Sequence, residues 1–268
     1  MSYPIFPALA LTALLGAFSS VLANAEAKPP KRVLIVTVTK GFRHGSIPVA
    51  ETTLKTLADD SKGKFTVDYA RTDDEVQSKM TATALKGYDA VFFANTTGDL
   101  PIPDRDAFIT WVRAGHGFLG AHAASDTFHG YEPYTRMIGG EFKTHGPQVS
   151  VTCTIEDTKH PATKHFEQPA FEVYDEIYEF KSFDWKRVHG LLRMDAHPQT
   201  KAPGEYPLAW CRREDKGRIF YTALGHRDEI WQAPWFRQHL MGGILWTLGY
   251  QKGEDKSQKR ERVPTQFR

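Results

Sequence analysis

The feature that most constrains the fold is a series of short apolar strands that alternate with helical segments. Val33 to Val38 is a near-continuous apolar run, which is typical of a strand buried on both faces of a parallel sheet. A glycine turn at residues 40–45 follows, and Ser46 is expected to cap the next helix. Further strands are predicted at 65–70, 88–94 and 117–121, with helices at 74–80 and 103–114. This alternation predicts an α/β fold, a doubly wound, mostly parallel sheet with helices on both faces.

The pattern changes after Gly139 and Gly140. From there to residue 224 the chain consists mainly of predicted strands, at 149–155, 172–180, 188–193, 207–213 and 218–224. We expect an antiparallel extension of the same sheet, because no linker composition separates the two halves. A last helix at 234–248 carries an apolar stripe, which favours a core role over a ligand site.

One domain is therefore expected over residues 32–250, with residues 26–31 as a linker. Residues 251–268 are charged and are predicted to form a disordered tail. The net charge of +2 gives no reason to expect a nucleic-acid partner.

The first 25 residues read as a separate segment. The run from Ala8 to Leu15 is apolar apart from Thr12, and Ala23-Asn24-Ala25 is a small-x-small cleavage signal. A signal peptide is predicted, cleaved near Ala25, so that the protein is exported, either periplasmic or secreted. An N-terminal membrane anchor is the alternative, although the apolar run is shorter than the ~20 residues of a bilayer span. No later segment is apolar enough for stable membrane insertion.

Export would permit a disulfide bond between the two cysteines. Cys153 and Cys211 both lie in alternating, strand-like segments. They can pair only if those strands adjoin, and two buried free thiols are the alternative.

Four histidines lie at or near the predicted strand ends. His44 follows the first strand, His122 the fourth and His226 the last, and His145 follows the glycine-rich segment at 139–144. Ligands of doubly wound sheets bind beyond the carboxyl ends of the strands. We therefore expect a shared pocket, the alternative being ordinary solvated or core histidines.

Imidazole serves proton transfer or metal ligation at neutral pH. The spacing lacks the compactness of a His-Glu-x-x-His motif, and a divalent metal ion remains one option, with His122, His145 and His226 as its candidate ligands. Within a strand, Glu176 and Tyr178 would share one face. The alternative is that Glu176 is an ordinary solvated strand charge.

Aromatic residues surround these candidates and favour a small polar organic ligand, although each can equally be core. They are Phe42, Phe128, Tyr131, Tyr178, Trp185 and Trp231.

Several ordered motifs give the chain its family resemblance. They are Gly41-Phe42-Arg43-His44, residues 115–122 ending in Gly120-Ala121-His122, residues 139–145, Asp175-Glu176-Ile177-Tyr178, residues 217–226 and Gly243-Ile244-Leu245-Trp246. In these motifs the chain resembles the trehalose-utilisation ThuA-like family, which shares the class I glutamine amidotransferase-like fold. The resemblance covers residues 31–250, nearly all of the expected mature chain.

The resemblance implies a role in carbohydrate catabolism without a cysteine nucleophile. Where amidotransferases of this fold carry the nucleophilic cysteine, this chain has His122-Ala123-Ala124, so thiol-based glutamine hydrolysis is not expected. The implied substrates are small carbohydrates, 3-keto-disaccharides or glycosides, made by a sugar oxidoreductase partner. A 3-keto group acidifies the neighbouring C–H, so a base can begin elimination or isomerisation, with a divalent metal ion polarising the ketone.

The expected catalytic residues are His122 and His145, supported by His44, His226 and Glu176. The expected substrate-binding residues are Phe42, Asp126, His129 and Tyr178. The leading hypothesis is a lyase, hydrolase or isomerase acting on an oxidised glycoside. A non-catalytic sugar-binding module on an amidotransferase-like scaffold and a metallohydrolase of unrelated substrate range are the alternatives.

Overall fold

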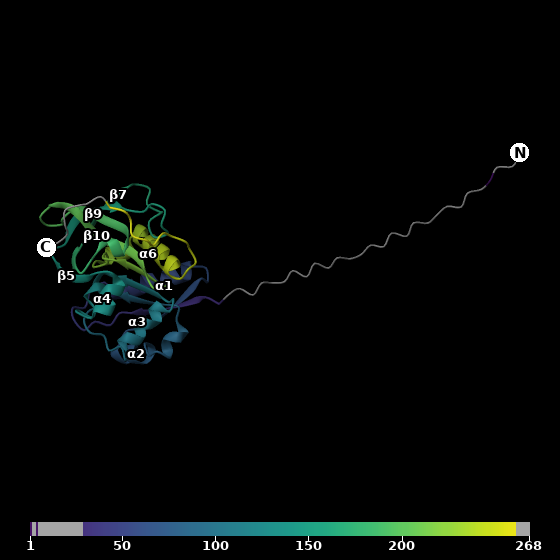
Figure 1. Cartoon of the computed structure of the whole chain (residues 1–268), viewed down its shortest axis with the longest axis horizontal. Helices are drawn as coiled ribbons and strands as arrows, with labels where there is room; N and C mark the ends of the chain where they lie inside the picture. Colours follow the sequence, from purple (N-terminus) through teal and green to yellow (C-terminus); the bar gives the residue numbers. More distant parts are fainter. Residues whose placement is uncertain (2–3, 5–28, 261–268) are drawn as a thin grey trace.

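The structure, a computed structural model, describes residues 1, 4 and 29–260 (Figure 1). Apart from Met1 and Pro4, the predicted signal peptide lies outside the described residues. Within them, no helix combines the length and the apolar character that crossing a bilayer requires.

The elements follow one another in an order that changes from alternating strands and helices to mainly strands. They are β1 (Lys31–Val36), α1 (Ile47–Asp60), β2 (Phe65–Ala70), α2 (Asp73–Lys79), η1 (Ala84–Gly87), β3 (Ala90–Ala94), α3 (Arg105–Arg113), β4 (Gly117–Ala121), η2 (His122–Asp126), α4 (Glu132–Ile138), β5 (Glu141–His145), β6 (Val149–Ile155), β7 (Ala170–Asp175), β8 (Tyr178–Lys181), η3 (Trp185–Arg187), β9 (His189–Ala196), β10 (Pro203–Glu214), β11 (Gly217–Thr222), α5 (Asp228–Gln232) and α6 (Pro234–Thr247).

The described strands form one nine-stranded sheet and one two-stranded sheet. The large sheet has the order β2-β1-β3-β4-β11-β10-β9-β6-β7. Strands β2, β1, β3, β4 and β11 are parallel to one another, whereas each later pairing is antiparallel. The predicted α/β architecture with an antiparallel extension is therefore confirmed.

Two apolar cores lie on the two faces of this sheet. On one face Ala50 and Leu54 of α1 and Ile244 of α6 are buried against the strands. On the other, Phe108 of α3 and Ile138 of α4 are buried in a second cluster. Figure 1 shows α3 and α4 on the opposite side of the sheet from α6. The apolar stripe of α6 is core, as predicted, because Phe236, Leu240, Ile244 and Leu245 are buried and Trp235 packs against them.

The predicted strand over 172–180 is wrong in one respect, because it is two strands in different sheets. β7 ends at Asp175 and β8 begins at Tyr178. β8 pairs with β5, a short strand that the sequence pattern did not reveal. Glu176 and Tyr178 therefore do not share one face of a strand. The chain turns at Glu176 and Ile177, which are both buried.

Ser46 does not cap α1 as predicted. Its hydroxyl makes no capping hydrogen bond and instead donates to the Gly225 carbonyl oxygen at 3.2 Å. This hydrogen bond connects the turn after β1 with the loop after β11. It is a tertiary contact, so the local sequence preference for a helix cap does not predict it.

Residues 251–260 differ from the predicted disordered tail. They contain no helix or strand, but they lie against the antiparallel half of the sheet. The Gln258 amide hydrogen-bonds both to Gly190 N at 2.8 Å and to its carbonyl oxygen at 2.9 Å. Residues 261–268 lie outside the described residues.

The two cysteines are buried and free. Cys153 lies in β6 and Cys211 in β10, and β9 lies between those strands. The strands do not adjoin, so the alternative of two buried thiols describes this structure.

Candidate active site

Three histidines and one glutamate converge at the carboxyl ends of the parallel strands. His44 lies in the turn after β1, His122 is the first residue after β4 and His226 lies in the loop after β11. Glu176 reaches them from the turn between β7 and β8. One ligand atom from each of these four residues lies within 4.8 Å of the others.

Strand order explains this convergence. Ala121, the last residue of β4, pairs in parallel register with both Ala94 of β3 and Thr222 of β11. These strands therefore end at the same level, and the residues that follow β4 and β11 emerge side by side although they are about 100 positions apart in the chain.

His122 is held by its backbone and by its ring. Its φ of 46° is in the left-handed region, which few residues other than glycine adopt, and this turns the side chain inward. The Nδ1 atom lies 2.8 Å from the Ala223 carbonyl oxygen. Since a carbonyl only accepts, Nδ1 bears the hydrogen and Nε2 of the neutral ring carries a lone pair. That buried Nε2 lies 3.5 Å from Glu176 Oε1.

The other two histidines approach the same carboxylate and one another. His226 Nδ1 lies 3.3 Å from Glu176 Oε1. The His44 ring packs edge-on against His122 at 4.7 Å and against His226 at 5.2 Å, measured between ring centroids. Nδ1 of His44, Nε2 of His122 and Nδ1 of His226 are buried and have no hydrogen-bond partner.

The pKa shifts follow from this crowding. Burial, and then the neighbouring His122 and His226, lower the pKa of His44 to about 3, so its imidazole is neutral near pH 7. Burial alone would raise the pKa of Glu176, but its contacts with His122 and His226 outweigh burial and lower it. The nearby Glu176 raises the pKa of His226 against the effect of burial. The site thus combines an ionised carboxylate with nitrogen donors.

A divalent cation fits this donor set. Buried polar atoms are normally hydrogen-bonded, so three unpartnered imidazole nitrogens beside one carboxylate need an explanation. Three imidazoles and a carboxylate are common ligands of zinc and other first-row divalent metals. The His122–Ala223 contact is the outer-shell hydrogen bond that usually fixes a ligating histidine.

Three side chains outside the cluster, those of Asp175, Asn95 and Trp231, hold the loop after β11 through the backbone of Gly225. The buried Asp175 accepts a hydrogen bond from Gly225 N at 2.8 Å. The Gly225 carbonyl oxygen accepts from Asn95 Nδ2 at 3.0 Å and from Trp231 Nε1 at 2.8 Å. The sequence pattern did not reveal Asn95 and Gly225 as supporting residues, although Asn95 follows β3 and so obeys the same strand-end rule.

His145 lies at the edge of the group instead of inside it. Its Nδ1 lies 3.2 Å from Glu176 Oε2 and 2.9 Å from the Gly146 carbonyl oxygen. Both neighbours are acceptors, so Nδ1 bears the hydrogen and Nε2 is the basic nitrogen. The side chain is 43% exposed. The group of possible metal ligands therefore contains His44, whereas the candidate ligands named from the sequence were His122, His145 and His226.

The predicted substrate-binding residues form two groups around the cluster of His44, His122, His226 and Glu176. The Phe42 ring is 66% exposed and lies 4.9 Å from the His44 ring, and the buried Tyr178 ring lies 4.1 Å from the His122 ring. His129 bridges Asp126 and Glu141 through its two ring nitrogens. Burial opposes protonation of His129, but these two carboxylates raise its pKa. Glu141 was not among the predicted site residues, and it lies in the unpredicted strand β5.

Of the remaining aromatic candidates, Phe128, Trp185 and Trp231 are core residues, since each is less than a tenth exposed. Tyr131 donates a hydrogen bond to Asp106 and packs at the edge of the second core.

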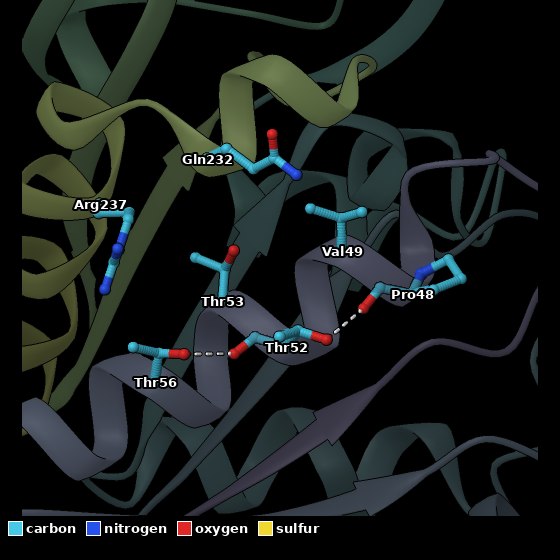
Figure 2. A pocket seen from close by; sticks show the side chains of 7 residues that line it. All are labelled: Pro48, Val49, Thr52, Thr53, Thr56, Gln232 and Arg237. Carbon is cyan, nitrogen blue, oxygen red and sulfur yellow. Dashed lines mark hydrogen bonds between the residues drawn. The ribbon is translucent and has the colours of Figure 1, made fainter.

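Of two hollows on the surface, one lies next to the histidine cluster and the other does not. One, of about 330 Å³, has His226 in its wall. The other, of about 370 Å³, lies between α1 and the α5–α6 region (Figure 2). Figure 2 shows the hydroxyls of Thr52 and Thr56 in that second hollow, and they donate to backbone oxygens of α1 itself. Only the first hollow adjoins the histidines.

Comparison with known proteins places this arrangement in a family. The sequence model of the ThuA family, described as "Trehalose utilisation", matches residues 32–247. A comparison with curated proteins found no significant match.

Solved structures show the same fold. A ThuA-like protein from Parabacteroides merdae is 21% identical, with a TM-score of 0.68, over 87% of this chain and 93% of the other. A ThuA-like protein from Bacteroides uniformis is 22% identical, with a TM-score of 0.66, over 82% and 93%. An alpha-L-fucosidase isoenzyme from Paenibacillus thiaminolyticus is 12% identical, with a TM-score of 0.52, over 82% of this chain but 33% of its own length.

The family match spans the whole of the domain that carries the histidine cluster, from β1 to the end of α6. The chain belongs to the ThuA family of trehalose utilisation, and its role is carbohydrate-related.

Proposed function

We propose that this chain is an enzyme that processes oxidised disaccharides or glycosides at a divalent-cation site formed by His44, His122, His226 and Glu176. One observation carries the metal part of the proposal, the convergence of three unpartnered imidazole nitrogens on one carboxylate. Family membership supports the carbohydrate part.

A bound divalent cation would polarise the carbonyl oxygen of a keto sugar. His44, His122 and His226 would hold the cation in the neutral form of their rings, and Glu176 would offset its charge. Nε2 of the partly exposed His145 side chain would act as the base, because Nδ1 bears the ring hydrogen.

For a 3-keto-glycoside the balanced step is an elimination. The base removes the proton at C2, and its electron pair forms the C1–C2 double bond as the bond from C1 to the glycosidic oxygen breaks. The departing alkoxide takes up one proton and leaves as the free alcohol. The substrate must therefore come from a reaction that oxidises a sugar hydroxyl to a ketone, which is why a sugar oxidoreductase is the proposed functional partner.

Measurement of metal content and turnover on the same samples tests this proposal. We expect the purified chain to bind one divalent cation, and His44→Ala, His122→Ala and Glu176→Gln each to weaken that binding at least tenfold. Turnover of a 3-keto-disaccharide should stop in the presence of a chelator. His145→Ala should retain the cation but lose turnover, by about 10²-fold or more for a general base.

Two results would contradict the proposal. Full turnover in His122→Ala would show that the histidine cluster does not take part in the reaction. Binding of glycosides without any product, with the cation present, would favour a sugar-binding module.

We further propose that the chain acts after export. The support is the sequence pattern over residues 1–25. N-terminal sequencing of the protein recovered from outside the cytoplasm tests this, with a mature chain beginning near residue 26 as the expected result.

A further inference from the structure

The hollow beside His226 has polar walls from three separate parts of the chain. Gly45 and Ser46 come from the turn before α1, Gln148 from the residue before β6, and residues 226–229 from the loop that enters α5. Its volume of about 330 Å³ is in the range of small-molecule sites. His226 and the residue after His44 belong to its wall, so a molecule in the hollow would adjoin the histidine cluster.

The cation in this wall, Arg227, is already committed to neighbours. Its Nη1 donates to Gln148 Oε1 at 2.7 Å and its Nη2 to Glu229 Oε1 at 3.0 Å. Its guanidinium also lies over the Tyr174 ring, 5.0 Å from the centroid. Asp228 and Glu229 bring two carboxylates to the same wall. Apart from His226, the wall therefore offers hydrogen-bonding groups without the surplus positive charge that a phosphate requires.

We infer that this hollow binds the second, non-reacting ring of a neutral, unphosphorylated disaccharide. Hydroxyl groups can donate to Asp228 and accept from the N–H groups of Arg227 that Gln148 and Glu229 do not use, whereas a phosphate on that ring would face the two carboxylates. The inference rests on the proposed function for the position of the first ring at the histidine cluster.

Gly45 allows a direct test, because a Cβ at this position meets no atom within 4 Å and its φ is unremarkable. Gly45→Trp should fill the hollow, and Gly45→Ala is the matched control with one methyl group. Gln232→Trp places the same bulk in the unrelated hollow of Figure 2.

Calorimetry on the full chain would measure binding of trehalose, glucose and trehalose 6-phosphate, with metal content determined on the same samples. We expect trehalose to bind at least tenfold more tightly than either other ligand. Gly45→Trp should remove that advantage over glucose, whereas Gly45→Ala and Gln232→Trp should keep it. Unchanged trehalose binding in Gly45→Trp would overturn the inference, as would equal binding of trehalose and glucose by the unmodified chain.

Asp228→Arg provides a second variant that does not depend on filling the hollow. It should weaken trehalose binding severalfold and strengthen binding of trehalose 6-phosphate by at least tenfold. If Gly45→Trp loses its cation, Asp228→Arg decides the question. An affinity ratio of trehalose to trehalose 6-phosphate that is the same in Asp228→Arg as in the unmodified chain would overturn the inference. Because these are binding measurements, failure here leaves the turnover test of His122→Ala intact.

Discussion

His122 carries a positive backbone φ and a fully buried ring at the same position. A left-handed conformation costs a residue with a Cβ on the order of 1 kcal/mol relative to glycine. Here that conformation directs Nε2 toward Glu176 while Nδ1 reaches the Ala223 carbonyl oxygen. Strain at a functional residue persists only where its surroundings hold it.

The strain at His122 predicts an order of stability among its variants. Both His122→Gly and His122→Ala lose the ring, but only glycine adopts a φ of 46° without steric cost. We expect His122→Gly to be more stable than His122→Ala by about 1 kcal/mol. Urea unfolding in the presence of a chelator measures this difference without a contribution from metal binding. An alanine variant as stable as the glycine variant would show that the backbone is not strained.

At the scale of elements, residues 251–260 act as a strap across the antiparallel half of the sheet. Arg260 donates to Glu205 Oε2 at 2.8 Å and to Glu156 Oε2 at 2.7 Å. Its guanidinium lies 3.6 Å from the centroid of the Trp185 ring. The charged composition of this segment suggested disorder, but the same charges find partners on the sheet. Composition cannot distinguish a solvated charge from a paired one.

Removal of the Arg260 side chain from this segment should therefore lower stability. Arg260→Ala deletes two ion pairs with half-buried carboxylates and the contact with Trp185, and we expect a loss of about 1–2 kcal/mol. The neighbouring Lys259 is exposed, so Lys259→Ala is the matched control, with no expected change beyond ~0.5 kcal/mol. Thermal unfolding of both variants measures the effect. Equal unfolding midpoints for Arg260→Ala and the unmodified chain would mean that the Arg260 contacts contribute nothing to stability.

At the scale of the whole molecule, β11 joins the two halves of the large sheet. It pairs in parallel with β4 on one side and antiparallel with β10 on the other. This position brings His226 beside His122, and the order of the antiparallel strands puts β9 between β10 and β6, which carry the two cysteines. Sheet order thus assembles the site and also keeps Cys153 and Cys211 apart.

The separation of the cysteines predicts their reactivity. Burial raises the pKa of both thiols well above the usual range, so neither supplies a reactive thiolate in the folded chain. We expect no reaction of the native protein with a thiol reagent and two reactive thiols after denaturation without reductant. A reductant should leave the unfolding midpoint unchanged. No reactive thiols in the denatured chain would instead indicate a disulfide.

The sequence by itself determined the parallel half of the fold. Strands buried on both faces are continuous apolar runs, so β1, β3 and β4 could be recognised from local composition. The strand-end rule then selected four histidines, His44, His122, His145 and His226, because side chains that follow parallel strands emerge at one edge. Three of them lie in the cluster. Both inferences depend on residues that are near one another in the chain.

Only the tertiary structure decided which groups form the cluster. The break between β7 and β8 moves Glu176 out of a regular strand and toward the histidines, and no local pattern marks that break. His44 lies inside the cluster, whereas the β5–β8 pairing leaves His145 at its exposed edge. The choice among histidines depends on contacts between segments about 30 to 180 positions apart. Such distances are set by the order of strands in the sheet, which the periodicity of a single strand does not encode.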